Sequence, residues 1–152
     1  MKKIALTQGK FAKVDDFNYE VLNKFKWYAK KSGKMFYAYR NLKGKSVLMH
    51  AFIVGTPKGK DTDHIDGDGL NNQENNLRIC THSQNVINRG KYKNNTSGFK
   101  GVFWDKKEKK WKVEIRVNKE KKYIGRFLKK EDGYMAYCEA CIKYHGEFSN
   151  LK

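Results

Sequence analysis

The sequence has little of several features that would place it in a specialised class. It contains three cysteines and one proline among 152 residues, and no apolar run reaches the length of a membrane span. A small, odd number of cysteines argues against a disulfide framework and suits a reducing compartment. The lysines at the N-terminus precede no long apolar stretch, so the start is a poor signal peptide. We expect a cytoplasmic protein with no membrane segment.

Acidic residues are also scarce. The chain has 16 Asp and Glu against 33 Lys and Arg, which gives a formal net charge of +17. Residues 1–85 carry +7 and residues 86–152 carry +10, so the excess is spread along the chain and is not a tail. With 14% aromatic residues, this composition favours a nucleic-acid partner over a lysine-rich surface that only aids solubility. No basic amphipathic helix that would bind an anionic membrane is evident.

The order of turns and apolar patterns predicts an α+β chain in two parts. A chain of this length holds one ordinary domain or two small ones. A stretch with few apolar side chains, "VINRGKYKNNTSG", separates them and carries three cationic residues expected to contact DNA: Arg89, Lys91 and Lys93. The expected parts are a small β/α extension over residues 1–48, a core over 49–85, a basic linker over 86–98 and a second domain over 99–152.

The N-terminal part predicts short strands and one helix. Asp15 or Asp16 suits the N-cap of a helix that ends near residue 25. Its apolar residues at helical spacing are Phe17, Val21, Leu22 and Phe25. Residues 26–41 read as a hairpin around "KSGK". The apolar run at 46–55 is a strand or a short helix, and Gly55 and Pro57 end it.

The C-terminal part predicts a three-stranded antiparallel sheet packed on one helix. Three strand-like runs, over residues 99–105, 109–118 and 121–128, have short connections, which favour antiparallel pairing. A helix follows over residues 129–146. In the middle run, alternation places Trp111, Val113, Ile115 and Val117 on the side of the core.

One segment contrasts with the basic chain: "DTDHIDGDGLNNQENNL", residues 61–77, holds five acidic residues and no Lys or Arg. An EF-hand needs regularly spaced oxygen ligands and glycine at the sixth position, and neither Asp61 nor Asp63 gives a register that fits. Asp66 and Asp68 suit turn formation instead. A third interpretation is a metal-dependent nuclease, for which Asp63 and His64 would supply an oxygen ligand and a base. We expect the missing cations to leave Asp63 free of a competing positive charge.

Asp63 and His64 are neighbours, and neighbours on a plain strand point apart, so we expect this pair at a strand end or bend. Asn76 and Asn85, from the segments that follow, would complete the set. The pattern "DHIDG…NN…NLR…T.S.N" resembles the HNH, or ββα-metal, nucleases found in phage and intron-encoded homing endonucleases. The stretches "KWYA", "VLMH", "NNTSGFKGV" and "YHGEFSNL" resemble HNH proteins that carry a C-terminal DNA-binding domain of the plant ethylene-response (Apetala) type.

The resemblance implies a role for each matching residue. Asp63 would bind a single Mg²⁺ or Mn²⁺ ion with Asn85, His64 would act as general base, and Asn76 would orient that histidine through a backbone contact. Oxygen ligands favour these hard cations over zinc. The implied substrate is double-stranded DNA, cut to a 5′ phosphate and a 3′ hydroxyl. A monomer would nick, and two protomers or two events would be needed to cut both strands.

The resemblance also implies that the C-terminal sheet enters the major groove. The matching positions for DNA contact are Lys100, Phe103, Glu114, Arg116, Lys121 and Tyr123, with Trp104 and Lys106 in a first turn of different length. Several of these are lysine or aromatic where the plant domains have arginine, so the plant target sequence does not carry over. Glu114 would accept from a cytosine or orient Arg116.

Two further features have competing interpretations. His50, beside an apolar run, either supports the fold or approaches a phosphate. Cys138, Cys141 and His145 have zinc-like spacing, but they lie on a predicted helix where small buried residues are needed, so we expect no structural zinc. The alternative to an active nuclease is a sequence-specific DNA-binding regulator with an inactive nuclease domain. A protein-interaction module would show no steep salt dependence of DNA affinity.

Overall fold

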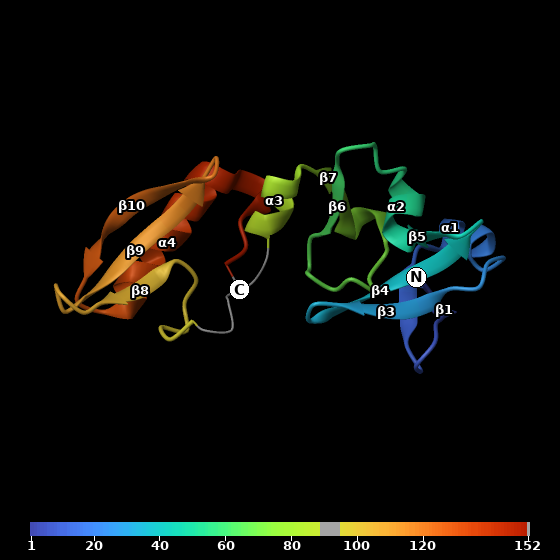
Figure 1. Cartoon of the computed structure of the whole chain (residues 1–152), viewed down its shortest axis with the longest axis horizontal. Helices are drawn as coiled ribbons and strands as arrows, with labels where there is room; N and C mark the ends of the chain where they lie inside the picture. Colours follow the sequence, from blue (N-terminus) through green and yellow to red (C-terminus); the bar gives the residue numbers. More distant parts are fainter. Residues whose placement is uncertain (89–94, 152) are drawn as a thin grey trace. The chain divides into compact units, whose positions relative to one another are not determined.

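The computed structural model describes residues 1–88 and 95–151, and it divides into two compact units, Met1–His82 and Ser83–Lys152. Figure 1 shows the order of the elements along the chain. The division falls slightly before residue 85, the expected end of the nuclease part. Within the described residues, no helix is long and apolar enough to cross a membrane.

The first unit contains three small antiparallel sheets and short helices. The sheets pair β1 with β2, β3 with β4 and β5, and β6 with β7. The elements are β1 (Lys2–Ala5), β2 (Phe11–Val14), α1 (Asp16–Leu22), β3 (Tyr28–Ser32), β4 (Met35–Leu42), β5 (Lys45–Leu48), α2 (Met49–Val54), β6 (Asp61–His64), η1 (Glu74–Asn76) and β7 (Leu77–Cys80). The predicted hairpin is present as β3 and β4, and the apolar run beyond it is a strand followed by a helix.

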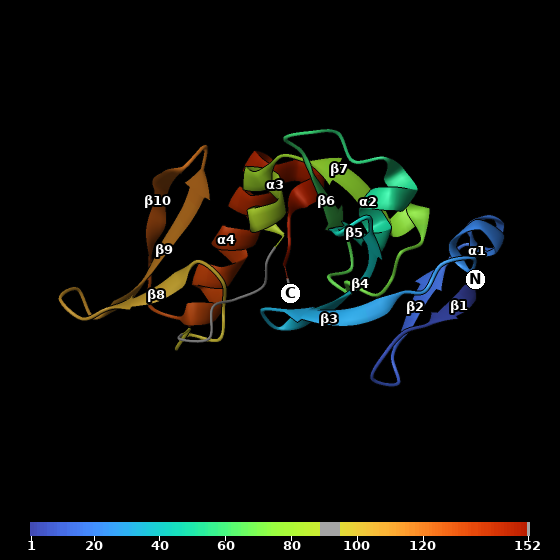
Figure 2. The same ribbon diagram turned by 45° about the vertical axis from the view of Figure 1, so that its right-hand side comes forward.

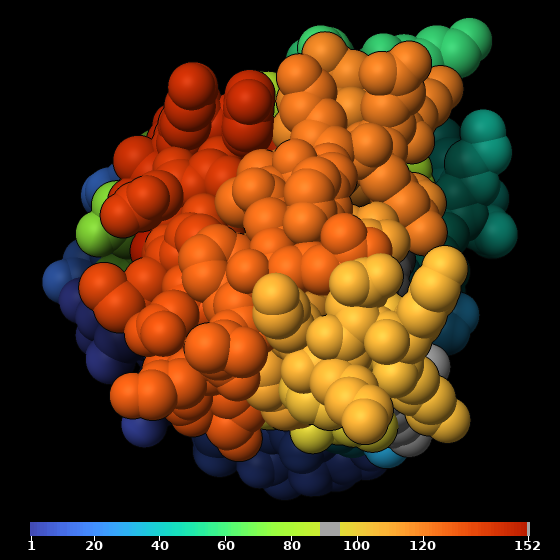
Figure 3. Space-filling view, turned by 90° about the vertical axis from the view of Figure 1, so that its left-hand side faces the viewer, coloured from blue at the N-terminus to red at the C-terminus, as the bar shows by residue number. Residues whose placement is uncertain are grey.

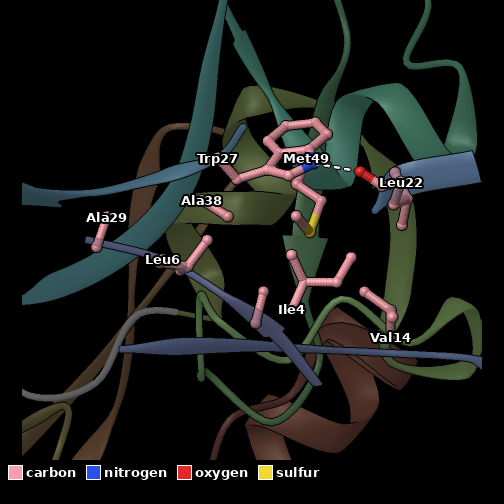
Figure 4. Packing of buried hydrophobic residues seen from close by; sticks show 9 residues of the cluster. Ile4, Leu6, Val14, Leu22, Trp27, Ala29, Ala38 and Met49 are labelled. Atoms are coloured by element: carbon pink, nitrogen blue, oxygen red, sulfur yellow. Dashed lines mark hydrogen bonds between the residues drawn. The ribbon is translucent and has the colours of Figure 1, made fainter. Parts of the chain in front are cut away.

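The core of the first unit gathers side chains from β1 to α2. Figure 4 shows Trp27 and Met49 above the aliphatic side chains of the first two strands. The Trp27 indole donates from Nε1 to the Leu22 carbonyl at 2.8 Å, so its one polar atom is satisfied inside the core. The buried set is Ile4, Leu6, Ala12, Val14, Leu22, Trp27, Ala29, Ala38 and Met49.

Helix α1 is shorter and less amphipathic than predicted. Asp15 is the N-cap residue, but its side chain makes no capping bond. Leu22 is buried, whereas Phe17 and Val21 are exposed. The helix ends because Asn23 is its C-cap and the chain then turns to place Trp27 in the core. Of the four residues predicted to form an apolar face, only Leu22 is buried, so that prediction was wrong for the other three.

The second unit contains an antiparallel sheet with one long helix against it, as Figure 2 shows. Strand β9 is central, and β8 and β10 lie at its two edges. The elements are α3 (His82–Ile87), which begins at the unit boundary, β8 (Val102–Asp105), β9 (Lys110–Val117), β10 (Glu120–Phe127), α4 (Lys130–His145) and η2 (Gly146–Phe148). These match the three strands and the helix expected from the sequence.

The alternation predicted for β9 agrees with its burial. Val113 and Ile115 are buried against α4, with Trp111 and Val117 partly buried beside them. On α4, Tyr137 and Cys141 face the sheet, whereas Tyr144 is 38% exposed. Lys122 of β10 lies over the Tyr144 ring, with its Nζ 4.9 Å from the ring centroid.

The C-terminal end of the predicted linker belongs to the second unit. Ser97 is buried, and its hydroxyl donates to the Phe99 carbonyl at 2.9 Å. The Asn95 side chain donates to the same carbonyl and accepts from the Gly98 amide. Residues 95–98 are therefore a hydrogen-bonded turn that precedes β8. The predicted DNA contacts Arg89, Lys91 and Lys93 lie outside the described residues.

Gly101 provides a test of packing between β9 and α4. Its φ is +75°, and an added Cβ would lie 2.1 Å from the Tyr137 ring and 2.9 Å from the Glu114 carbonyl oxygen. Gly98 has a similar φ, +82°, but open space. Both Gly→Ala changes incur the left-handed backbone penalty, while Gly101→Ala also overpacks, so it should lose about 1–3 kcal/mol more stability. Denaturant unfolding of the two variants checks this, and equal losses would contradict it.

Candidate functional site

Asp63 and His64 lie at the end of a strand, as their adjacency required. They are the last two residues of β6, and both are buried. The register with β7 sets Asp63 opposite Arg78 and His64 opposite Leu77. The chain turns directly after His64, whose carbonyl accepts from the Gly67 amide at 3.0 Å. The hairpin therefore presents both side chains where the acidic segment leaves the sheet.

A cation contacts the candidate metal ligand, contrary to expectation. Arg78 donates to Asp63 Oδ2 from Nε at 2.9 Å and from Nη2 at 2.7 Å. Both side chains are largely buried, with 6% of Asp63 and 13% of Arg78 exposed. The antiparallel register brings Arg78 across the hairpin, so a segment that has no cation of its own still receives one. The expectation of a carboxylate without a cationic neighbour was wrong.

His64 sits in a polar and aromatic enclosure. Its Nε2 lies 3.4 Å from the Asn72 side-chain oxygen, and Asn72 is fully buried. The His50 ring meets the His64 ring edge-on, with centroids 4.9 Å apart, and the Tyr37 ring lies 5.8 Å from His64. Asn72 lies in the turn between β6 and β7, His50 in α2 and Tyr37 in β4. The orientation of the imidazole therefore depends on three separate segments.

Burial controls the protonation of both histidines. It lowers the pKa of His50 to about 3, and repulsion from His64 acts in the same direction. Burial also lowers the pKa of His64, although the Asn72 hydrogen bond and the charges of Asp66, Asp63 and Asp68 oppose the shift. His64 is thus held in the neutral form that a proton acceptor needs. The enclosed position of His50 favours support of the fold over contact with a phosphate.

Asn76 holds the turn that follows His64. Its side chain accepts from the Asp66 amide at 3.0 Å and donates to Asp66 Oδ1 at 3.0 Å and to the Asn71 carbonyl at 2.8 Å. Its own carbonyl accepts from the Ile65 amide at 2.9 Å. Asn76 therefore acts on the residues next to His64, while Asn72 is the side chain at its imidazole. The predicted orienting role of Asn76 stays a prediction.

Asp66 and Asp68 build the turn, as their residue types suggested. Asp66 accepts from the Asp68 amide at 2.8 Å and from the Asn71 side chain at 2.7 Å. Burial raises the pKa of Asp66, but these bonds and the bond from Asn76 outweigh burial and leave the pKa below its usual value. Asp68 accepts from the Leu70 amide at 3.0 Å. Both carboxylates therefore serve as local hydrogen-bond acceptors.

The N-terminal strands clamp the same turn. Lys13 donates from its amide to the Leu70 carbonyl and accepts from the Asn72 amide, each at 2.8 Å. Asp15 accepts from the Gln73 side chain at 3.1 Å and from the Glu74 amide at 2.7 Å. The Asp15 carboxylate therefore caps η1 and not its own helix α1. Residues 13–15 fix the backbone around Asn72.

Gly69 allows this turn to lie against β4. An added Cβ would lie 2.5 Å from the Phe36 carbonyl oxygen and 2.7 Å from the Tyr37 ring. Tyr37 can therefore contact both Gly69 and the two histidine rings. A glycine is required at position 69 because no larger residue fits this close approach.

The remaining acidic residues of the segment also have partners. Asp61 Oδ2 lies 3.0 Å from His82 Nδ1, and Glu74 accepts from the Asn18 side chain at 2.9 Å. No group of three or more His, Cys, Asp or Glu side chains is arranged to hold a metal ion in residues 1–88 and 95–151. The predicted ligand Asn85 lies on α3 and is half-buried. Its role stays a prediction.

The second unit presents a basic sheet surface opposite α4, and Figure 3 views this unit with α4 in red and the sheet in orange. Four of the predicted DNA contacts are exposed on that surface: Phe103, Arg116, Lys121 and Tyr123. Glu114 shares the surface but lies 2.5 Å from Lys112 Nζ. This ion pair is a third alternative to the two roles considered for Glu114.

Two predicted DNA contacts differ from expectation. Lys100 Nζ donates to the Ile87 carbonyl at 2.6 Å, which caps the end of α3 and directs the amine inward. Trp104 lies in β8 and not in the turn after it; it pairs with Trp111, and their rings meet edge-to-face with centroids 5.0 Å apart. That face is the side of α4. Lys106 is exposed in the turn between β8 and β9.

Sequence reasoning did not predict the positions of three side chains at these sites. Asn72 belongs to an "NN" pair in a polar segment, and a buried polar residue leaves no periodic signal. Arg78 would have been found from the register of β6 with β7, which places it opposite Asp63. Arg126 is exposed on the basic surface because of an irregularity in β10 that alternation does not predict.

The buried pair of His50 and His64 predicts acid sensitivity. Because the pKa of His50 is about 3 in the fold and near 6.5 when unfolded, the unfolded chain binds more protons between these values. Stability should fall by a few kcal/mol as the pH drops through that window. His50→Gln should flatten this dependence in thermal melts across pH, whereas His82→Gln, at an exposed side chain, should not. Parallel curves for all three proteins would refute the assignment.

The family model that the chain matches covers the part that holds this site. Residues 43–87 match the family model described as HNH endonuclease. The chain is 45% identical over 56 residues to Protein 3.8 of Escherichia phage T7, a match covering 37% of this chain and 46% of that protein. No solved structure matches.

A second relative aligns over more of the chain. It is an uncharacterized HNH endonuclease of Acanthamoeba polyphaga mimivirus, 38% identical over 101 residues, which cover 62% of this chain and 50% of that protein. The chain thus spans about half the length of the curated relatives it matches. The matched residues include β6, β7 and α3. The similarity to HNH endonucleases therefore includes the segment that holds Asp63 and His64.

Proposed function

We propose that the chain is a metal-dependent DNA endonuclease of the homing type, in which the C-terminal sheet selects the DNA. The observation that carries the proposal is the pair Asp63–His64, buried at the end of β6 within the matched residues. His64 is neutral because burial lowers its pKa, and Asn72 holds its Nε2. A neutral, oriented imidazole in an HNH domain is suited to deprotonate water.

The reaction follows from these groups. His64 takes a proton from water, whose oxygen forms a bond to phosphorus as the bond from phosphorus to the 3′ oxygen breaks. The 3′ oxygen leaves and is protonated, which gives a 5′ phosphate and a 3′ hydroxyl. One such site cuts one strand, so a single protomer nicks. Asn76 keeps the turn at Ile65 and Asp66 in place, and thereby limits movement of His64 during proton transfer.

The oxygen donors fit a hard divalent cation such as Mg²⁺ or Mn²⁺. Asp63 offers a carboxylate, and Asn85, on the strength of the sequence resemblance, offers an amide oxygen. A few protein ligands are enough, because Mg²⁺ keeps several waters. A bound cation would offset the charge that develops on the phosphate and the leaving oxygen. Arg78 already shares Asp63 Oδ2, so the cation and the guanidinium would compete for that oxygen.

The same ion pair favours a second candidate function. Arg78 neutralises Asp63 without any metal, and a buried carboxylate satisfied in this way suits a domain that has lost catalysis. The chain would then be a sequence-specific DNA-binding regulator. The two functions share DNA binding and differ only in metal-dependent cutting.

A plasmid assay separates them. Wild-type protein with Mg²⁺ or Mn²⁺ should nick supercoiled DNA, and EDTA should abolish nicking. His64→Ala should lower the rate about 10²–10⁴-fold, because the water loses its base, while DNA binding by gel shift persists. His82→Ala, at an exposed histidine, is the matched control. Undiminished nicking by folded His64→Ala would rule out the proposed base, and no nicking by wild type would favour the regulator.

The resemblance to the ethylene-response type, together with the basic surface of the second unit, supports DNA binding by the sheet. Arg116 and Lys121 are cross-strand neighbours on that surface. Replacing both by alanine should weaken binding and reduce the slope of log affinity against log salt by about 2, since each phosphate contact contributes about 0.9. Lys129→Ala with Lys143→Ala removes the same charge from exposed positions at and beside α4. Equal effects of the two pairs would indicate non-specific attraction.

A further inference from the structure

The outer surface of the second-unit sheet, defined as the face of β8, β9 and β10 opposite α4, follows from the strand registers. Val113 and Ile115 face α4, so their neighbours on β9 face outward. Directly paired residues share a face, which extends the surface to the edge strands. Its members are Phe103, Asp105, Lys110, Lys112, Glu114, Arg116, Lys121, Tyr123 and Arg126.

Arg126 reaches this surface because of a β-bulge. Simple alternation from Tyr123, which faces outward, would direct Arg126 toward α4. The register shifts between Tyr123 and Gly125, so Arg126 pairs with Lys112 and Phe127 pairs with Trp111. One inserted residue thus directs a guanidinium outward and returns Phe127 to the core.

The Arg126 side chain is held across the sheet. Its Nε donates to Asp105 Oδ2 at 3.0 Å, and its Nη1 lies 3.5 Å from the Tyr123 hydroxyl. Asp105 is itself fixed, because its Oδ1 accepts from the Lys107 and Glu108 amides at 3.2 and 3.3 Å. Arg126 remains 38% exposed on its side chain, whereas Asp105 is 16% exposed. Asp105 therefore holds the guanidinium at Nε, while the Arg126 side chain remains partly accessible.

This arrangement suits a particular partner. Asp105 occupies Nε, and within residues 1–88 and 95–151 no acceptor is recorded for Nη2. Two terminal N–H groups on a rigid plane match O6 and N7 of guanine in the major groove. Resting on the proposed function of this sheet as a DNA reader, we propose that Arg126 reads a guanine, with Asp105 as its positioning residue.

Arg126 and Asp105 could also form only a surface ion pair with no role in DNA recognition. That alternative predicts a different effect of substituting either residue. Exposed pairs of this kind contribute little to stability, and loss of either partner would then leave DNA recognition unchanged. Recognition of a base requires orientation as well as charge. Lysine at this position keeps the charge but cannot form the fork. Asn at position 105 keeps the shape and weakens the anchor.

The test is selection from a random-sequence duplex library by the full-length chain in EDTA, which prevents cutting. Wild type should enrich a guanine at one position. Arg126→Lys and Asp105→Asn should both lose that preference, and Arg126→Lys should bind the enriched duplex about 10-fold or more weakly, with little change on random DNA. Lys110→Ala, on the same surface, should weaken both duplexes alike and leave the preference intact. Thermal melts confirm that each variant is folded.

Two outcomes would overturn the inference, and they differ in meaning. If wild type enriches a sequence and Arg126→Lys enriches the same one, Arg126 reads no base, while DNA recognition by the sheet stands. If wild type enriches no sequence and its affinity shows no salt dependence, the inference fails together with the proposed function on which it rests.

Discussion

The arrangement of the candidate site depends on one constraint, the backbone of the turn between β6 and β7. Asn76 ties the turn from inside through Asp66 and the Asn71 carbonyl. Lys13 ties it from outside, by accepting the amide of Asn72. Asn72 then holds Nε2 of His64. This turn is polar and buries few apolar side chains. Its backbone conformation is therefore fixed mainly by hydrogen bonds on both sides.

This constraint links residues outside the HNH match to the candidate site. Lys13 and Asp15 precede residue 43, yet both bond to the turn. Tyr37, also outside the match, contacts the His64 ring. The N-terminal strands and the residues of the HNH match therefore share one hydrogen-bond network, and the extension is part of the same folded unit as the candidate site.

Much of this organisation could be predicted from residue types. The position of Asp63 and His64 at a strand end followed from their adjacency, and the buried face of β9 followed from its alternation. What escaped prediction was pairing between segments distant in sequence. Arg78 is one residue beyond a stretch without cations, but register places it opposite Asp63. Asp15 has the residue type of a helix cap, but it caps η1, fifty-nine residues away in sequence.

Register also explains why Arg126 escaped prediction, and the two cases have opposite chemical consequences. At Asp63 the register brings a cation to a buried carboxylate, where the positive charge pairs with the carboxylate and would compete with a metal ion for it. At Arg126 the shifted register brings a cation to an exposed surface, where 38% of its side chain remains accessible. A positive charge therefore has different effects in a single basic chain. The effect depends on the acidic partner. Asp63 pairs with Arg78 in a buried position, whereas Asp105 binds Arg126 only through Nε.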